Sequence, residues 1–160
     1  MKNQSSKLKV YQLVSALPED AEALTQLCRI SKMHWDYPPE WLELWKEALT
    51  LSEEYIRENP VFKLLLGDQI VGFSAFREGL DYWNLDHLWL SPEVIGQGWG
   101  KILLNDSLKK VESKHHLFKV VADPNARPFY ERQGFQQIGQ VASVPKGRYI
   151  PVLELKLAYN

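Results

Sequence analysis

The sequence predicts an α+β fold of the mixed α/β kind. Its 160 residues are 45% hydrophobic and 24% charged, which is the composition of an ordinary globular domain. Segments with the periodicity of strands alternate along the chain with segments of helical periodicity. A glycine cluster separates one predicted strand from the helix that follows it. The length suits one domain and leaves no room for a (β/α)8 barrel or a two-domain oxidoreductase.

The first third of the chain is predicted to be mostly helical. Lys9–Ser15 forms a first strand, and Pro18 opens a helix to about Lys32, because proline and acidic residues suit a first turn. Cys28 falls on the same face of this helix as two leucines, which places it in the core. A second helix follows the prolines after Tyr37, and its apolar residues at helical spacing are Trp41, Leu42, Leu44, Trp45, Ala48 and Leu49.

The rest of the chain is predicted to alternate strands and helices. Ser52, followed by two glutamates, is expected to cap the N-terminus of a helix. After it we expect a hairpin of strands Val61–Leu66 and Ile70–Arg77, then a strand Trp83–Leu90 and a helix from about Trp99 to Ser113. The later elements are strands Leu117–Val121, Phe135–Val141 and Pro151–Leu157, a short helix Asn125–Gln133 and a loop Ser143–Arg148.

The balance of charge excludes several classes of function. Nineteen Lys and Arg against 20 Asp and Glu give a formal charge of −1, which predicts no generic affinity for nucleic acid or an anionic membrane. Residues 1–10 carry three lysines and no apolar signal segment, so a cytoplasmic location is expected. Cys28 is the only cysteine, which excludes an intrachain disulfide. The four histidines have no metal-binding spacing, so no metal is expected.

The glycine cluster Gly96-Gln97-Gly98-Trp99-Gly100 opens the long predicted helix. Unpaired N–H groups and the dipole at a helix N-terminus both favour an anion, so this turn suits a phosphate group. A Walker A loop is excluded, because Ile95 and Ile102 stand where that motif needs Gly and Ser or Thr. A dinucleotide-binding fingerprint fails as well, because Lys101 replaces its third glycine. The alternative is a tight turn whose glycines serve only backbone geometry.

Two segments carry a resemblance to a known family. Pro92-Glu93-Val94-Ile95-Gly96-Gln97-Gly98-Trp99-Gly100-Lys101-Ile102-Leu103-Leu104 is similar to motif A of the GNAT (GCN5-related) N-acetyltransferases. Further along, Asp123-Pro124-Asn125-Ala126-Arg127-Pro128-Phe129-Tyr130-Glu131-Arg132-Gln133-Gly134-Phe135 resembles motif B, N-x-x-A-x-x-F-Y-x-x-x-G-F. Together, in this order and separation, the two motifs are a specific signal.

The resemblance implies a single GNAT domain over residues 1–160, with a core at about 10–157. The family fold has a mixed central sheet that splays between strands 4 and 5, with helices on both faces. Acetyl-CoA is the implied cosubstrate, with its pantetheine in that gap and its pyrophosphate on the amides of the glycine loop. The implied cofactor-binding residues are Leu88, Trp89, Leu90, Ile95, Gly96, Gln97, Gly98, Gly100, Lys101, Asn125, Phe129 and Tyr130.

The chain departs from the family pattern at two positions. Ile95 stands where the family usually has Arg or Gln, so a side-chain contact to phosphate is lost while the backbone amide remains. Asp123 stands where motif B usually begins with Asn, and Asn125 could supply the amide contact instead.

No covalent nucleophile is evident, which favours direct attack of an amine on the thioester. The resemblance directs the hydroxyl of Tyr130 toward the cofactor sulfur. Asp86 is the first candidate for the general base and His87 the second, while a water route needs neither. Because they are adjacent on one strand, these two residues are expected to face opposite sides of the sheet. Ordinary roles as strand residues, and a packing role for Tyr130, are the alternatives.

The acceptor site is predicted from composition. Four aromatic residues crowd the first helices, and with the interleaved Glu40, Glu43 and Glu47 they would suit a cationic or aromatic amine. Arg148 leaves an acidic acceptor open. The substrate-binding candidates are Trp35, Tyr37, Trp41, Trp45 and Arg148, although an aromatic stripe at helical spacing is more often part of a core.

The sequence thus predicts an acetyl-CoA-dependent N-acetyltransferase that acts on a small-molecule or peptide amine, as a monomer or homodimer. A non-catalytic acyl-CoA-binding sensor of the same fold is the alternative, because of Ile95 and the ambiguous base. A nucleic-acid-binding module that uses the aromatic residues is disfavoured by the net charge.

Overall fold

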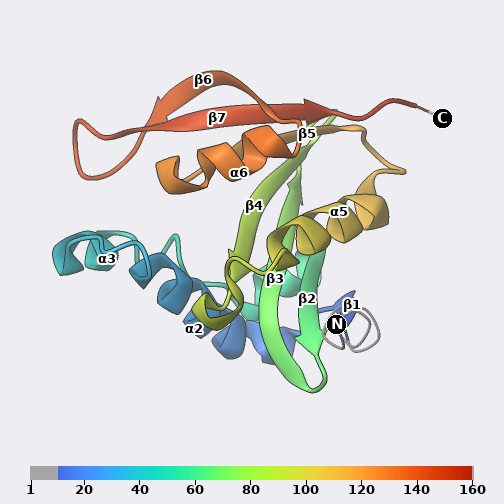
Figure 1. Ribbon diagram of the computed structural model, residues 1–160, viewed down its shortest axis with the longest axis horizontal. Helices are drawn as coiled ribbons and strands as arrows, with labels where there is room; N and C mark the ends of the chain where they lie inside the picture. Colours follow the sequence, from blue (N-terminus) through green and yellow to red (C-terminus); the bar gives the residue numbers. More distant parts are fainter. Residues whose placement is uncertain (1–10, 160) are drawn as a thin grey trace.

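The computed structural model describes residues 11–159, which form a seven-stranded sheet with helices on both faces (Figure 1). The strand order is β1-β2-β3-β4-β5-β7-β6. All neighbouring strands are antiparallel except β4 and β5, which are parallel. The predicted mixed fold is therefore confirmed.

The strands are β1 (Tyr11–Ser15), β2 (Val61–Leu66), β3 (Gln69–Glu78), β4 (Trp83–Leu90), β5 (Leu117–Val121), β6 (Gln136–Ala142) and β7 (Tyr149–Lys156). The α-helices are α2 (Ala21–Met33), α3 (Pro39–Leu44), α4 (Glu53–Glu58), α5 (Trp99–Val111) and α6 (Arg127–Arg132). Short 3-10 turns occupy Pro18–Asp20, Pro92–Val94 and Pro124–Ala126.

Most elements lie where the sequence predicts them. The side chain of Ser52 accepts a hydrogen bond from the Tyr55 amide, which confirms it as the N-cap of α4. The second predicted helix ends at Leu44 and continues only as turns, in which Leu49 N still bonds to Trp45 O. Lys9, Val10 and the lysine-rich start of the chain lie outside the described residues.

On one face of the sheet, α2 and the segment after it pack over β3 and β4. Leu24 and Cys28 of α2 are fully buried in this cluster, together with Phe73 of β3. The core position predicted for Cys28 is confirmed. Burial raises the pKa of its thiol to about 12, so it stays protonated and is no nucleophile.

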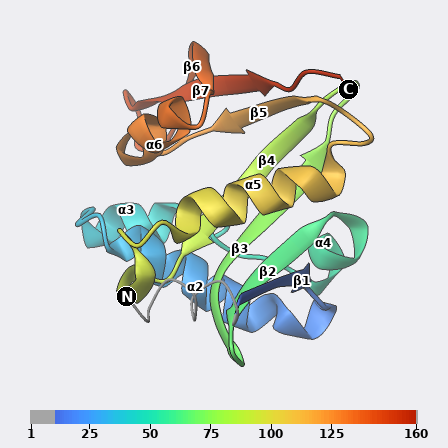
Figure 2. The same cartoon turned by 45° about the vertical axis from the view of Figure 1, so that its right-hand side comes forward.

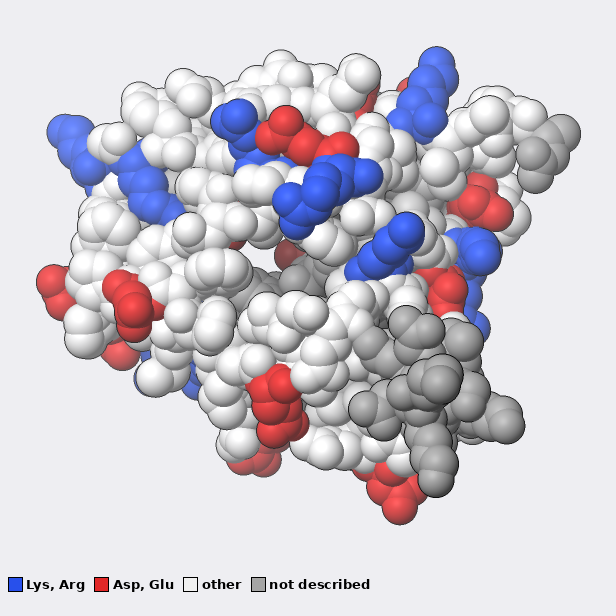
Figure 3. All heavy atoms as spheres, in the orientation of Figure 1, with Lys and Arg blue, Asp and Glu red and all other residues white. Residues whose placement is uncertain are grey.

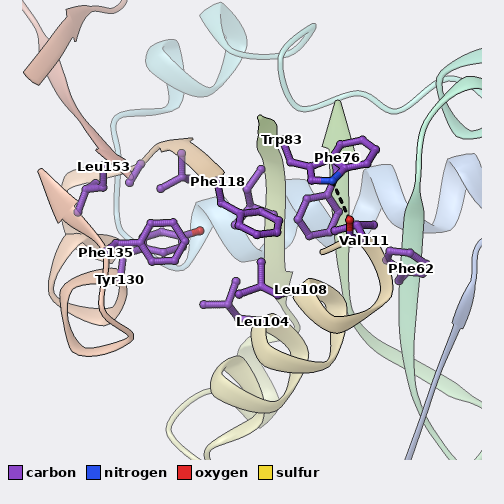
Figure 4. Close-up of a cluster of buried hydrophobic side chains, with 13 residues drawn as sticks. Phe62, Phe76, Trp83, Leu104, Leu108, Val111, Phe118, Tyr130, Phe135 and Leu153 are labelled. Carbon is purple, nitrogen blue, oxygen red and sulfur yellow. Dashed lines mark hydrogen bonds between the residues drawn. The ribbon is translucent and has the colours of Figure 1, made fainter. Parts of the chain in front are cut away.

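On the other face, α5 and α6 share one core with the strands (Figure 4). Leu104 and Leu108 of α5 meet Phe76 and Phe118 there. The indole N–H of Trp83 at the start of β4 donates a 2.9 Å hydrogen bond to the carbonyl oxygen of Val111. This contact ties the C-terminus of α5 to the strand that leads to the glycine loop.

The sheet is held together only weakly between β4 and β5. The two strands pair at Trp83 with Phe118 and at Asn84 with Lys119, and nowhere else. Beyond those pairs the strands separate (Figure 2), so the backbone of Leu85–Leu90 lacks strand pairing on that edge. The sheet therefore consists of two halves, β1–β4 and β5–β7, that diverge as the GNAT resemblance implies.

Among residues 11–159, no helix has the length and apolar character needed to cross a bilayer.

Candidate active site

The glycine loop between β4 and α5 has a backbone that favours glycine. Gly96 and Gly98 have φ values of +83° and +88°, in the left-handed region where other residues are strained. Gly98 is the N-cap of α5. A Cβ added to either glycine would meet no atom within 4 Å, so the space beside them is open to a ligand. The loop and the N-terminus of α5 therefore fit a phosphate-bearing group.

Gly100 serves a different purpose, which is close packing. A Cβ added there would lie 3.1 Å from Cε1 of Phe129, on α6. Glycine thus lets the first turn of α5 approach α6, and the two motifs of the resemblance meet in space.

One cavity of about 570 Å³ joins the glycine loop, the free edge of β4 and the β5–α6 segment. This volume is within the range of small-molecule sites. In Figure 3 the molecular surface is hollowed near the middle of the face, beside several Lys and Arg side chains. The predicted cofactor-binding residues that line the cavity are Leu88, Trp89, Leu90, Ile95, Gly96, Gly98, Gly100, Lys101, Asn125, Phe129 and Tyr130.

Gln97 does not line the cavity. It is exposed, and its side-chain amide donates to the backbone oxygen of Glu93. The sequence reasoning missed other lining residues, which are Ser31, Leu85, Val120, Val121, Ala122, Asp123, Ala126, Pro128, Arg132 and Gln133. Arg132 adds a cation to a wall that Lys101 already makes basic, and its place one turn after Phe129 on a helix was the available signal.

Tyr130 is buried on α6, with 5% of its surface exposed. Its ring makes edge contacts with Phe129 and Phe135, both at 5.3 Å between centroids. The hydroxyl forms no hydrogen bond to another residue of 11–159, and Figure 4 shows it pointing toward Phe118 and β4. A tyrosine used only for packing usually satisfies its hydroxyl, so this cavity-lining donor lacks its expected partner. Burial also raises the pKa of Tyr130 above its usual value, which keeps the hydroxyl protonated.

A β-bulge changes the predicted geometry of Asp86 and His87. In the β3–β4 register, His87 lies opposite Ala75 and Leu85 opposite Phe76, so Asp86 is an extra residue. Both side chains consequently reach Tyr55 of α4: Asp86 through a hydrogen bond, and His87 through its ring, 6.2 Å between centroids. The expectation that they face opposite sides is wrong, because strict alternation fails at a bulge.

Asp86 lines the cavity and has two partners. Tyr55 donates its hydroxyl to Oδ2 at 2.7 Å, and Arg77 donates Nε to the same oxygen at 3.2 Å. Oδ1 has only a 3.5 Å contact with Arg77 Nη2. One oxygen of the carboxylate is thus held firmly, and the other keeps room for a proton or a water molecule.

His87 is differently placed. Its Nδ1 receives the indole N–H of Trp89 at 3.0 Å. An indole nitrogen only donates, so Nδ1 acts as acceptor, and the proton of the neutral ring is on Nε2. Burial lowers the pKa of His87 despite the opposing charge of Asp86, so the neutral form prevails. With its one acceptor nitrogen occupied, His87 is poorly set to take a proton.

The predicted acceptor aromatics divide into two groups. Trp35 is 40% exposed and lines the cavity. Tyr37, Trp41 and Trp45 pack on one another behind the wall and do not line it, with the Tyr37 and Trp45 rings 4.8 Å apart. Trp45 is 6% exposed, which favours the core alternative for this residue.

The structure adds a buried ion pair that the sequence reasoning missed. Lys32 of α2 binds Asp123, the residue that stands where motif B usually has Asn. Asp123 also accepts hydrogen bonds from the Tyr37 hydroxyl at 2.9 Å and from the backbone N–H of Asn125 at 2.8 Å. Lys32 lies four residues after Cys28, on the buried face of α2. A lysine at that helical spacing was the signal for a buried cation in need of a partner.

These features can be compared with known proteins. A family model described as Acetyltransferase (GNAT) domain matches residues 34–151. The chain belongs to the GNAT acetyltransferase family. No curated protein matches the GNAT chain significantly.

Solved structures share its fold. One is the PaiA N-acetyltransferase of Thermoplasma acidophilum in complex with coenzyme A, with a TM-score of 0.75 and 20% identity over 92% of this chain and 99% of that one. Another is a GCN5-related N-acetyltransferase of Rhodopseudomonas palustris, with a TM-score of 0.75 and 22% identity over 91% and 95%. A third is the ribosomal-protein-S18-alanine N-acetyltransferase of Escherichia coli, with a TM-score of 0.69 and 15% identity over 94% and 96%.

Within 11–159, no three His, Cys, Asp or Glu side chains are grouped so as to hold an ion.

Proposed function

We propose that this GNAT protein transfers the acetyl group of acetyl-CoA to a primary amine of a small molecule or peptide, by direct attack in a ternary complex. Family membership implies acetyl transfer from acetyl-CoA. The observation that carries the finer proposal is the single cavity that contains the glycine loop, the unpaired edge of β4, Tyr130 and Asp86.

The two ends of the cavity suit the two parts of the cosubstrate. The pyrophosphate would lie on the amides of Ile95 to Lys101, where Lys101 and Arg132 supply positive charge. The pantetheine would run along Leu88–Leu90, whose backbone groups have no partner strand on that side. A backbone N–H of this stretch would polarise the thioester carbonyl.

The reaction needs one proton to leave the nitrogen and one charge to be stabilised on sulfur. The amine lone pair forms the new C–N bond, and the C–S bond breaks with its electron pair on the departing thiolate. We assign the amine proton to Asp86, directly at Oδ1 or through water. The Tyr130 hydroxyl donates a hydrogen bond to the sulfur. Because burial raises the pKa of Tyr130 further above that of a thiol, full proton transfer is uphill and hydrogen bonding is its role.

A second candidate is a non-catalytic acyl-CoA sensor. Two observations favour it: Ile95 offers no side-chain contact to phosphate, and Asp86 is already bound by Tyr55 and Arg77. The sensor would bind acetyl-CoA and release no thiol with any amine, whereas the enzyme releases CoA only when an acceptor is present.

The test is a thiol-release assay with acetyl-CoA and a panel of amines, amino acids and peptides, on the wild type and Tyr130→Phe. The variant keeps the ring and its contacts with Phe129 and Phe135, so it should fold. We expect kcat to fall about 100-fold or more, with CoA affinity by calorimetry unchanged. A wild-type kcat in the folded variant, with chemistry rate-limiting, would contradict the role of Tyr130. CoA binding without thiol release across the panel would favour the sensor.

A further inference from the structure

Two of the four aromatic rings expected to hold a cationic acceptor, Tyr37 and Trp45, already hold cations of the protein itself. The Lys32 ammonium lies 4.6 Å from the Trp45 ring centroid and 5.0 Å from that of Tyr37. The Arg148 guanidinium lies 4.7 Å and 5.4 Å from the same two rings. A substrate ammonium would have to displace these groups and would be repelled by them. The glutamates interleaved with the aromatics, Glu40, Glu43 and Glu47, are exposed and do not change this local arrangement.

The two cations are not compensated alike. Lys32 is paired with Asp123. Arg148 donates to the Tyr37 hydroxyl and to Ser143 Oγ, both at 3.2 Å and both neutral. Within residues 11–159, Arg148 has no carboxylate partner. A guanidinium has five N–H donors in a planar fork that matches a carboxylate, so Arg148 has unused capacity for an anion.

Arg148 is also held in place before any ligand arrives. It is half-buried on the loop between β6 and β7, with its guanidinium over the Trp45 ring. The Trp45 indole N–H in turn donates to the backbone oxygen of Val144 on the same loop, at 2.9 Å. A fixed fork loses less side-chain entropy when it binds a carboxylate than a free surface arginine does.

Arg148 does not line the cavity itself and is linked to its wall through Tyr37. Tyr37, to which it donates, is hydrogen-bonded to Asp123 and Asn125, and both of these line the cavity. Tyr37 packs in the core on the α2 side of the sheet, whereas the glycine loop opens α5 on the other side. Arg148 therefore lies behind the cavity wall on the side away from the glycine loop, which favours contact with the acceptor over contact with the phosphates of CoA.

We propose that the acceptor is an amine that also bears a carboxylate, such as an amino acid or a peptide with a free carboxylate, and that Arg148 binds this carboxylate. The proposal rests on the acetyl transfer proposed above. It replaces the cationic acceptor that the aromatic composition suggested.

The test compares α-amino acids with their α-amides at saturating acetyl-CoA, in the same thiol-release assay. The amides keep the side chain and the α-amine and lack the carboxylate charge; their amine is less basic, a difference that affects the wild type and Arg148→Gln equally. We expect kcat/KM for the acids to exceed that for the amides by about 10-fold to 100-fold, as for a hydrogen-bonded charge. Arg148→Gln should remove this preference by raising KM for the acids, with the amides within about twofold of wild type. Arg148→Lys should restore part of it, because the charge remains and the fork is lost.

The matched control is Lys146→Gln, which removes a cation from an exposed position of the same loop and should leave the preference intact. Equal turnover of acids and amides by the wild type would overturn the proposal. So would a folded Arg148→Gln variant that keeps the preference, or that loses acids and amides equally. If no amine releases thiol, the acetyl-transfer proposal fails instead. Calorimetric titration of the CoA-bound protein with acids and amides then still decides whether Arg148 binds a carboxylate.

Discussion

The buried pair of Lys32 and Asp123 should be energetically coupled, and its removal gives a sharp prediction. Each side chain is 10% exposed, so neither charge is well solvated when its partner is lost. We consider Lys32→Met, Asp123→Asn and the double variant. Methionine keeps the length of the lysine stem, and asparagine is the residue that GNAT motif B usually has at this position.

The expected loss of stability follows from the charge that each variant leaves unpaired. Lys32→Met leaves the Asp123 carboxylate with hydrogen bonds from Tyr37 and Asn125 but no counter-charge. Asp123→Asn leaves an ammonium against the Trp45 and Tyr37 rings, without an anion. Breaking one partner of a buried pair costs about 3–5 kcal/mol. At this chain length, a loss of 3 kcal/mol lowers Tm by about 6 to 12 °C.

The double variant should be more stable than the sum of the two losses implies, because no unpaired buried charge remains. We expect a coupling of about 2 kcal/mol or more in urea denaturation. The control pair is Arg57 and Glu53, which are 60% exposed and one helical turn apart. Arg57→Met with Glu53→Gln should couple by less than about 0.5 kcal/mol. Additive losses at Lys32 and Asp123, or single losses below about 1 kcal/mol, would refute the reasoning.

The same pair gives a dependence on pH with a definite sign. Burial alone would raise the pKa of Asp123, but the hydrogen bond and charge of Lys32, with the bonds from Asn125 and Tyr37, outweigh it and lower the pKa. A carboxylate with a depressed pKa stabilises the fold above its unfolded pKa of about 3.9, and that stability is lost as pH falls through the folded value. The stability gap between wild type and Lys32→Met should therefore be greatest where Asp123 is ionised in both proteins, and it should narrow as the pH falls into the acid range.

Three further outcomes are expected. Gly98→Asp puts a charged side chain in the open space beside the loop and should weaken CoA binding by at least about 10-fold in calorimetry, whereas Gly139→Asp, outside the cavity and with an ordinary φ, should not. Trp45→Ala should lower the free energy of unfolding by about 3–5 kcal/mol in urea denaturation, as for other large buried residues. A variant as stable as the wild type would contradict a core role for Trp45. Asp86→Asn should lower kcat about 100-fold. His87→Gln should retain most activity from pH 6 to 9, because Nδ1 of His87 is already bonded to Trp89. The reverse pattern would make His87 the general base.

The order of elements could be predicted because short-range signals mark them. The turn at Gly67-Asp68 sets the β2–β3 hairpin, and Ser91-Pro92 ends β4 at Leu90, where the sequence placed it. The glycine loop was likewise visible, because an N-terminal phosphate site depends on consecutive residues. These features depend on residues that are close together in the sequence, so the sequence alone is enough to find them.

The features that could not be predicted depend on residues far apart in the chain. Adjacent residues were expected to alternate at Asp86 and His87, but the bulge there is fixed by pairing with β3 and is invisible in β4 alone. The stacking of Arg148 on Trp45 joins residues more than 100 positions apart. Composition identified the aromatic residues but not that two cations of the chain already lie over Tyr37 and Trp45.

The two halves of the sheet share only two residue pairs between β4 and β5, so other contacts must set the width of the cavity between them. On the α5 side, Phe118 of β5 and Tyr130 of α6 join the core of the first half. On the α2 side, the connections are the pairing of Lys32 with Asp123 and the bond from Trp45 to Val144. Most of these contacts lie outside the cavity surface, yet they fix the separation of its walls. Substitution of Lys32 or Trp45 should therefore alter the affinity for acetyl-CoA, although neither side chain lines the cavity. An unchanged affinity would instead mean that the strands alone determine the width of the cleft.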